Sequence, residues 1–159
     1  MHQLAPAALA DACSVTGVRR LVHVSALGLG ERVTSGFLTS KRHGEAALLA
    51  RSIDCVIVRP SLLDGPDGYG TRWFRKVARW PVHFIPASAL GRMAPLDVDD
   101  LGVALSVLCE IDDLPLREIE LGGATEMTIR AYVARLRSEQ CGANARPALT
   151  LAIPHWLAR

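Results

Sequence analysis

The sequence has 159 residues, half of them hydrophobic, and its 18 Lys and Arg against 16 Asp and Glu give a formal net charge of +2. This length suits one domain with a real core, and the near balance of charge argues against a nucleic-acid-binding protein. No apolar run reaches the roughly 20 residues of a membrane span, and the N-terminus lacks the pattern of a secretory signal, so a cytoplasmic protein is predicted. The four cysteines are widely spaced, with no C-x-x-C pair and no histidine cluster, which indicates neither a metal site nor a disulfide framework.

Helical and strand patterns alternate along the chain. The expected elements are a helix over 5–16 that ends at Gly17, a strand over 19–26, a helix over 37–51 with Ser35 as its N-cap, a strand over 54–60, a helix over 71–79, a short strand over 82–87, a helix that Asp97, Asp99 or Asp100 caps and that runs to about Glu110, a strand over 117–123, and a helix from Thr128 to about Gln140. The strands are short and rich in Val, Ile and Leu, which is typical of strands buried on both faces. The basic residues of 72–79 are interpreted as a solvated helix face. The pattern predicts an α/β fold with a doubly wound parallel sheet.

The ends of these strands are the places to look for a site, because open parallel sheets bind ligands outside the carboxyl ends of their strands. Ser25 follows the first strand, 60–62 follow the second, and Gly122 and Gly123 end the third. Taken alone, Ser25 is best read as a turn residue, since serine often bonds to nearby backbone at such positions.

The next helix adds a second feature. Phe37 and Lys41 are four residues apart and share one helix face, twelve residues after Ser25. The segments "GVRRLVHVSALG", "SGFLTSKRHGEAAL", "DCVIVRPSLLDGP", "MAPLDVDDLGVAL" and "IELGG" follow in order over nearly the whole chain. In this the chain resembles the extended and atypical branches of the short-chain dehydrogenase/reductase superfamily. It is similar to NAD-dependent epimerases and dehydratases, and to the nucleotide-binding accessory subunit of respiratory complex I.

The resemblance implies roles for three residues. Ser25 would hydrogen-bond the substrate oxygen, and Lys41 would bind the nicotinamide ribose of NAD or NADP while lowering the pKa of a catalytic tyrosine. The position of that tyrosine is taken here by Phe37. A phenyl ring cannot exchange a proton, so the general acid of the family is absent from this position. Tyr69 and His43 are more distant candidates to replace it.

The resemblance also implies contacts for residues further along the chain. Pro60, Ser61 and Leu62 fall where the backbone of the family passes the nicotinamide. Arg92 falls near an arginine that meets a substrate phosphate in some members, although an ordinary surface arginine is the simpler interpretation. No metal ligands are implied.

The glycine-rich turn that receives the cofactor's pyrophosphate in the family is not found in this sequence. The glycines of "DGPDGYG" have a different spacing, so a phosphate-binding role is not assigned to them. Matched to the family, residue 1 falls before the fifth strand. We therefore expect 1–159 to form a single, incomplete Rossmann-like domain that lacks the N-terminal glycine-rich βαβ half and ends in a small substrate-side region.

The incomplete sheet would leave the strand over 19–26 as an apolar edge, which invites self-association. We also expect the chain alone to bind a dinucleotide weakly or not at all. Three interpretations stay open: a truncated or impaired NAD(P)-dependent oxidoreductase or epimerase, a non-catalytic nucleotide-binding or complex I-type assembly protein, and a degenerate remnant. With a completed fold, the partners would be the nucleotide and a small-molecule substrate.

Overall fold

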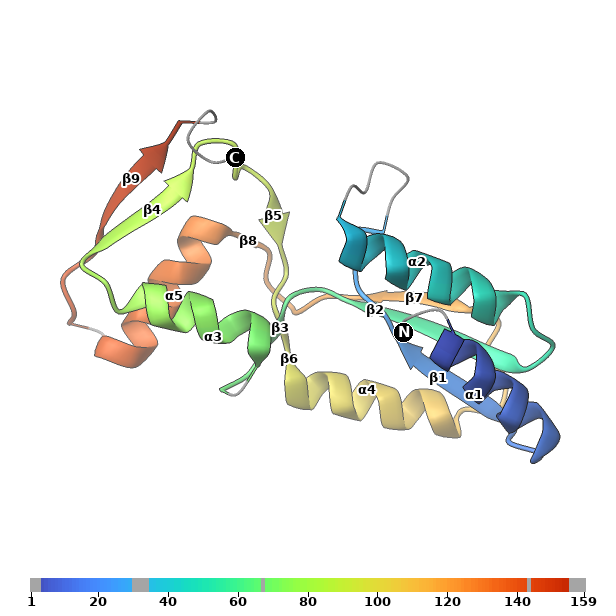
Figure 1. The fold of residues 1–159 in the computed structure, drawn as a ribbon. Coiled ribbons are helices and arrows are strands. Elements are labelled where there is room, and N and C mark those ends of the chain that lie inside the picture. The colour runs from blue at the N-terminus through green and yellow to red at the C-terminus, as the bar shows by residue number, and fades with distance from the viewer. Residues whose placement is uncertain (1–3, 30–34, 67, 143, 155–159) are drawn as a thin grey trace. The chain divides into compact units, whose positions relative to one another are not determined.

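The computed structural model describes residues 4–29, 35–66, 68–142 and 144–154, which form two compact units. Unit 1 comprises 1–61 and 99–121, and unit 2 comprises 62–98 and 122–159. Figure 1 shows helices and strands in both. Within the described residues, no helix is both long and apolar enough to cross a membrane.

Unit 1 is built on a three-stranded parallel sheet in the order β1-β2-β7. Its strands are β1 (Arg20–Val24), β2 (Asp54–Pro60) and β7 (Glu118–Leu121), and its helices are α1 (Leu4–Val15), α2 (Gly36–Leu49) and most of α4 (Val98–Glu110). β2 lies in the centre, and none of the described strands pairs with the outer edge of β1. The prediction of parallel strands alternating with helices is confirmed for this sheet.

The central strand is buried on both faces. Because side chains alternate along a strand, Cys55 and Ile57 point to one face, where they pack with Ala10 of α1 and Leu48 of α2. Val56 and Val58 point to the other face and are equally buried. Figure 1 shows α1 and α2 on one side of this sheet and α4 on the other. The apolar run of β2 is therefore explained by helices that cover both faces.

Arg20 ties the start of β1 to the end of α4. Its Nε donates to the Asp54 carboxylate at 2.7 Å, and its Nη1 donates to the carbonyl oxygens of Leu108, at 3.1 Å, and Ile111. The last carbonyls of a helix have no partner within the helix, so a guanidinium is well suited to them.

The described residues of unit 2 form two helices and three short strand pairs. The helices are α3 (Tyr69–Ala78) and α5 (Ile129–Cys141); the parallel pairs are β3 (Leu63–Asp64) with β6 (Leu96–Asp97) and β4 (Val82–Pro86) with β9 (Leu149–Ile153), and the antiparallel pair is β5 (Arg92–Met93) with β8 (Met127–Thr128). The expected strand over 82–87 thus forms, but it pairs with β9 and lies outside the β1-β2-β7 sheet. Strand β9 was not predicted.

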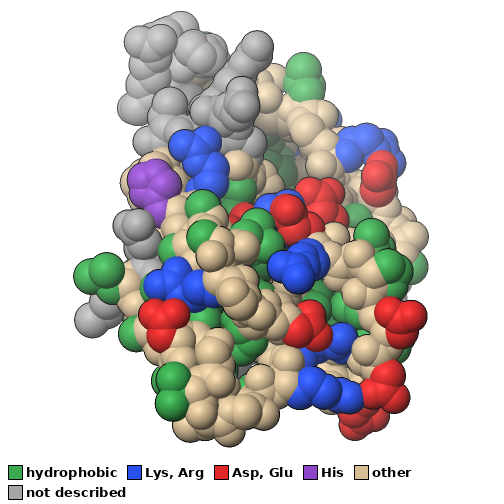
Figure 2. All heavy atoms as spheres, turned by 90° about the vertical axis from the view of Figure 1, so that its right-hand side faces the viewer, with side chains coloured by type: hydrophobic (Ala, Val, Ile, Leu, Met, Phe, Trp, Pro, Cys, Tyr) green, Lys and Arg blue, Asp and Glu red, His purple; other side chains and the backbone are tan. Residues whose placement is uncertain are grey.

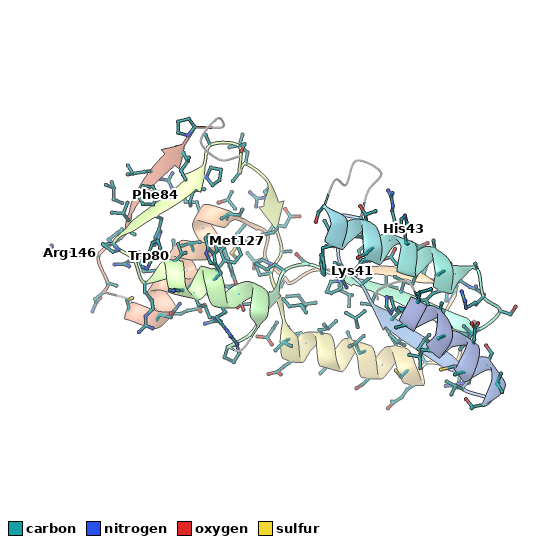
Figure 3. The ribbon with its side chains drawn as sticks, in the orientation of Figure 1. Lys41, His43, Trp80, Phe84, Met127 and Arg146 are labelled. Atoms are coloured by element: carbon teal, nitrogen blue, oxygen red, sulfur yellow. The ribbon has the colours of Figure 1, made fainter. Side chains whose placement is uncertain are left out.

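The core of unit 2 forms where α3 meets α5. Tyr132 and Leu136 are fully buried, and the ring of Phe74 meets the Tyr132 ring edge-on with 5.6 Å between centroids. Figure 3 shows Met127 at the start of the α5 segment, where it packs against this cluster. Thr128 accepts a hydrogen bond from the backbone N–H of Ala131 at 3.2 Å and is the N-cap of α5.

Arg137 binds the segments that follow α3 and α5. It donates to the carbonyl oxygens of Ala78 at 3.1 Å, Trp80 at 2.8 Å and Arg146 at 3.0 Å. Trp80 and Arg146 themselves lie beyond the ends of α3 and α5 (Figure 3). One guanidinium therefore fixes the turn after α3 and the segment that leads to β9.

Replacing Leu48, which is fully buried, with alanine should lower the free energy of unfolding by about 2–5 kcal/mol, because a cavity remains between α2 and β2. Urea denaturation followed by circular dichroism measures this. The matched control is Leu116→Ala, at a residue that is 60% exposed, which should change the value by less than about 0.5 kcal/mol. Equal losses in both variants would contradict this account of the core.

Candidate functional site

One face of α2 carries three residues at four-residue spacing: Phe37, Lys41 and Glu45. Glu45 is 3% exposed, Lys41 is half-buried, and Phe37 is 56% exposed, so burial increases along this face. The Lys41 Nζ lies 5.6 Å from the centre of the Phe37 ring. Figure 3 shows Lys41 on the side of α2 toward the sheet.

The sheet presents polar residues to this helix face. His23 and Ser25 are two residues apart, at the end of β1 and just beyond it, and so point to the same side. The Ser25 N–H continues the ladder by donating to the Val58 carbonyl at 2.7 Å. Arg59 of β2 lies on the same face of the sheet as His23 and Ser25. These side chains lie near the carboxyl ends of the parallel strands, where α/β sheets hold their ligands.

The buried ion pair between Arg59 and Glu45 joins β2 to α2. Arg59 Nη2 donates to Glu45 Oε2 at 2.7 Å, its Nε donates to Oε1 at 3.1 Å, and Nη2 also contacts Glu118 of β7. The hydrogen bond to Glu45 raises the pKa of the Arg59 guanidinium above its ordinary value, against the effect of burial. Burial by itself would raise the pKa of Glu45, but the Arg59 hydrogen bonds, the Ser25 hydroxyl and the charges of Arg59 and His23 together lower it.

The pKa values of Lys41 and His23 are also shifted, by burial and by neighbouring charges. Burial lowers the pKa of the Lys41 ammonium, and the nearby Glu45 carboxylate opposes the effect. Burial also lowers the pKa of the His23 imidazole, and the Lys41 charge lowers it further, whereas Glu45 raises it. His23, Lys41 and Glu45 therefore lie within electrostatic reach of one another, and the lowered pKa of His23 favours its neutral imidazole.

Ser25 is buried, with 5% of its surface exposed, and its Oγ has no hydrogen-bond partner among the described residues. Its hydroxyl lies near enough to Glu45 to lower the pKa of that carboxyl. The Glu45 carboxylate thus already interacts with this hydroxyl, and a ligand oxygen that accepts from Ser25 would take its place.

The residues that follow β2 divide between the two units. Pro60 and Ser61 continue the sheet of unit 1: the Pro60 carbonyl accepts from the Leu27 N–H at 3.1 Å, and the Ser61 N–H donates to the Leu121 carbonyl at 2.7 Å. Leu62 belongs to unit 2 and packs against the cluster around Tyr132.

Arg92 also lies in unit 2. It is bound to Glu126, with 3.1 Å between Nε and Oε2, in an exposed ion pair. This geometry fits the simpler interpretation of Arg92 as a surface residue. Ser25, Phe37, Lys41, Pro60 and Ser61 thus all belong to unit 1, whereas Leu62 and Arg92 belong to unit 2.

The structure adds His23, Glu45 and Arg59 to the residues selected from the sequence. Two signals could have found the first two: His23 stands two residues before Ser25 on the same strand face, and Glu45 stands one turn after Lys41. His43, by contrast, is exposed and only two residues from Lys41, so it lies on another face of α2. The side chain of Tyr69 lies outside the described residues.

The cofactor implied by the resemblance fits part of this arrangement. The buried Ser25 hydroxyl and the Lys41 ammonium are suited to a substrate oxygen and the hydroxyls of a nicotinamide ribose. The described part of the glycine loop, 64–66 and 68–70, is not arranged around a pyrophosphate: the Gly68 N–H is occupied by the Gly65 carbonyl at 3.3 Å, and the Thr71 hydroxyl donates to the same carbonyl at 3.0 Å. A Cβ on Gly68 would lie 2.6 Å from Thr71 Oγ1, so this glycine serves packing.

Across the described ranges, no group of three or more His, Cys, Asp or Glu side chains could hold a metal ion. Figure 2 shows basic and acidic side chains interspersed over the face in view, and the single-sign patch expected of a nucleic-acid interface is not seen on that face.

Glu45→Gln should lower the free energy of unfolding at pH 7 by about 3 kcal/mol, because it leaves Arg59 without its buried carboxylate. The pKa of Glu45 in the folded chain is below its usual 4.5, so the stabilisation is present above pH 4.5 and is lost as the pH falls through the lowered value. The difference between wild type and variant, measured by urea denaturation from pH 7 to pH 3, should therefore shrink. A difference that stays constant would contradict this. In the control, Glu110→Gln at the exposed end of α4 changes stability by less than about 0.5 kcal/mol.

The comparisons with known proteins concern both sequence and fold. No family model matches the chain. Over 114 residues, 70% of the chain, the sequence is 35% identical to the ceramide reductase of Caulobacter vibrioides, and this match covers 35% of the reductase. The fold is similar to that of dTDP-4-dehydrorhamnose reductase from Bacillus anthracis in complex with NADP, with a TM-score of 0.76, 18% identity, and coverage of 96% of this chain and 57% of the other. It is also similar to UDP-glucuronic acid 4-epimerase from Bacillus cereus in complex with UDP-glucuronic acid and NAD, with a TM-score of 0.71, 16% identity, and coverage of 96% and 54%.

The chain therefore spans about a third of the curated relative and just over half of each solved structure. At such low identity, the structural likeness establishes the fold alone. It confirms the prediction of an α/β arrangement of Rossmann type with parallel strands.

Proposed function

We propose that the chain is the later part of an NAD(P)-binding Rossmann-fold protein of the epimerase, dehydratase and reductase class, and that it is catalytically impaired. In this proposal, 1–159 is one part of a nucleotide-binding domain whose pyrophosphate site lies on residues other than those described. Lys41 binds the nicotinamide ribose, Ser25 bonds the substrate oxygen, and the backbone of Pro60, Ser61 and Leu62 passes the nicotinamide.

The observation that carries the proposal is the grouping of Ser25 and Lys41 around Glu45 at the carboxyl ends of a parallel sheet. Ser25 is buried and lacks a hydrogen-bond partner among the described residues, and Lys41 faces the same side. Solved proteins with this fold hold NAD or NADP. A reductase among the sequence relatives, at 35% identity, favours reduction of a carbonyl over epimerisation.

Impairment follows from Phe37. Reduction of a carbonyl needs a proton for the oxygen as well as a hydride for the carbon, and a phenyl ring supplies no proton. The Ser40 hydroxyl does not compensate, since it donates to the Phe37 carbonyl at 2.7 Å.

A second candidate is a non-catalytic nucleotide-binding protein, such as a complex I-type assembly or accessory protein. The same phenylalanine favours it, because binding and assembly do not need a proton donor. A degenerate remnant is the third candidate. The free thiols of the four cysteines are typical of a reducing compartment, which supports a cytoplasmic location within this proposal.

Fusing the N-terminal part of the Caulobacter reductase, up to the start of its match, to this chain should create a protein that binds NADH or NADPH. We expect a dissociation constant in the range of about 1 μM to 1 mM for the fusion and about 100-fold weaker binding for the 159-residue chain. Lys41→Ala in the fusion should weaken binding by about tenfold, since it removes a charged hydrogen-bond donor. Nucleotide fluorescence measures all three. Micromolar binding by the chain alone, or a fusion indifferent to Lys41→Ala, would refute the proposal.

Phe37→Tyr in the same fusion tests impairment. If the proton donor is what the site lacks, the tyrosine should raise the rate of carbonyl reduction by about 10² to 10⁴. The rate of NADPH oxidation with a panel of ketones measures this, and Phe84→Tyr, at an exposed residue of β4, is the control. A fusion that binds nucleotide but gains no activity would favour the non-catalytic candidate.

A further inference from the structure

We propose that helix α3 docks unit 2 onto an anionic phospholipid surface. The docking side of the helix, which we call the α3 outer face, comprises Arg72, Trp73, Lys76, Arg79 and Trp80. This inference goes beyond the proposed function and does not depend on it, because it involves neither a nucleotide nor a substrate. Binding to the surface of a bilayer requires no helix that spans it.

The five residues of the α3 outer face share one side of the helix. Arg72, Lys76 and Arg79 follow one another at spacings of four and three residues. Trp73 and Trp80 are seven residues apart, which is about two helical turns. All five side chains are exposed, Trp73 by 61% and Trp80 by 47%, and Figure 3 shows Trp80 at the end of α3. One side of a short helix thus presents three cations and two indole rings.

The opposite side of α3 belongs to the core of unit 2. Ala78 is fully buried there, and Phe74 packs against the same cluster. Arg75, the remaining cation of the helix, donates to the Asp64 carboxylate at 2.9 Å. Trp73 meets the Phe74 ring edge-on, with 5.2 Å between centroids, yet most of its side chain stays exposed. Folding of unit 2 therefore accounts for this side of α3 and leaves most of the outer face without an internal role.

The cations of the α3 outer face are not neutralised by the described residues. No carboxylate of those residues lies within ion-pair distance of Arg72, Lys76 or Arg79. Cations near the C-terminus of a helix are favourable, which suits Lys76 and Arg79. Arg72, however, lies in the first turn, close to the positive end of the helix dipole. Helix stability therefore does not account for Arg72, whereas binding of an external anion does.

A further cation, Arg146, lies beside this face. Arg137 donates through Nη1 to the Trp80 carbonyl at 2.8 Å and through Nε to the Arg146 carbonyl at 3.0 Å, so the two carbonyls flank one guanidinium (Figure 3). Arg146 is exposed, and it too has no carboxylate partner among the described residues. The end of the α3 outer face thus has additional positive charge nearby.

An anionic bilayer has chemical groups that match both kinds of side chain. Its phosphates attract Lys and Arg, each of which strengthens binding about fivefold near such a surface. Tryptophan rings are favoured at the level of the headgroups, because they combine an apolar body with a polar N–H. A helix that lies in the plane of the surface presents one side to it. Nucleic acid also carries phosphates, but a chain with a formal net charge of only +2 is poorly suited to it.

Sedimentation with sucrose-loaded vesicles tests the proposal on the full chain. The vesicles consist of phosphatidylcholine alone or of an equimolar mixture of phosphatidylcholine and phosphatidylglycerol. We expect the partition coefficient for the anionic vesicles to be at least about 25-fold higher than that for the neutral ones, which corresponds to two cations at about fivefold each. Raising the salt from about 0.1 M to about 1 M should remove most of this difference, because the Debye length falls from about 10 Å to about 3 Å.

Variants locate the contact on the chain. Arg72→Gln combined with Lys76→Gln should lower the partition coefficient for anionic vesicles about 25-fold. Trp73→Ala should lower it at least about fivefold, because less apolar surface leaves water. The matched control is Arg117→Gln, which removes an exposed cation of unit 1 and should change the coefficient less than about twofold. Circular dichroism checks that each variant is folded.

If the double variant does not fold, anionic vesicles that contain brominated phosphatidylcholine decide. In a Trp156→Phe chain, Trp73 and Trp80 are the two remaining tryptophans, and the bromine should quench their fluorescence. The proposal is overturned by equal or absent binding to the two kinds of vesicle, by losses as large in Arg117→Gln as in the double variant, or by unquenched fluorescence. Release of the bound chain by single-stranded RNA at constant ionic strength also overturns it, because the face would then prefer nucleic acid.

Discussion

The ion pair between Glu45 and Arg59 is the interaction on which the rest of unit 1 depends. It joins the C-terminal half of α2 to the central strand, and Arg59 also contacts Glu118 of the third strand. Burying two charges is expensive unless both are fully hydrogen-bonded, and the two-point contact of guanidinium and carboxylate meets that requirement. Such a pair also restricts how α2 can rotate, so it determines which helix face meets the ends of the strands.

Orientation of α2 has chemical consequences one and two turns earlier in the helix. With Glu45 held down by Arg59, Lys41 faces His23 and Ser25, and Phe37 lies at the more exposed end of the same face. Both oxygens of the Glu45 carboxylate accept hydrogen bonds from Arg59, so Glu45 does not form an ion pair with Lys41. The contact that stabilises the fold is thus also part of a cluster in which the pKa values of His23, Lys41 and Glu45 are shifted. Shifted pKa values are common at functional sites.

Local patterns in the sequence were sufficient for most of unit 1. The strand over 54–60 could be predicted because a strand buried on both faces must be apolar almost throughout. The helix over 37–51 could be predicted because it contains residues of high helix propensity, such as Ala, Leu and Glu. Arg59 was not predicted as a site residue, since an arginine inside an apolar strand has no visible partner until the helix fourteen residues earlier is folded against it. In unit 2, the pairing of β4 with β9 joins residues more than sixty positions apart and carries no local signal. The roles given to Ser25 and Lys41 by resemblance stay predictions.

The open edge of β1 has a consequence for thermodynamics. Its backbone groups face outward without a strand from the described residues beside them. Any strand that docks there, from a second copy or from another polypeptide, binds the folded form alone and raises the free energy of unfolding by mass action. The stability of such a chain is then set by concentration as well as by sequence, and its unfolding midpoint belongs to the solution in which it is measured.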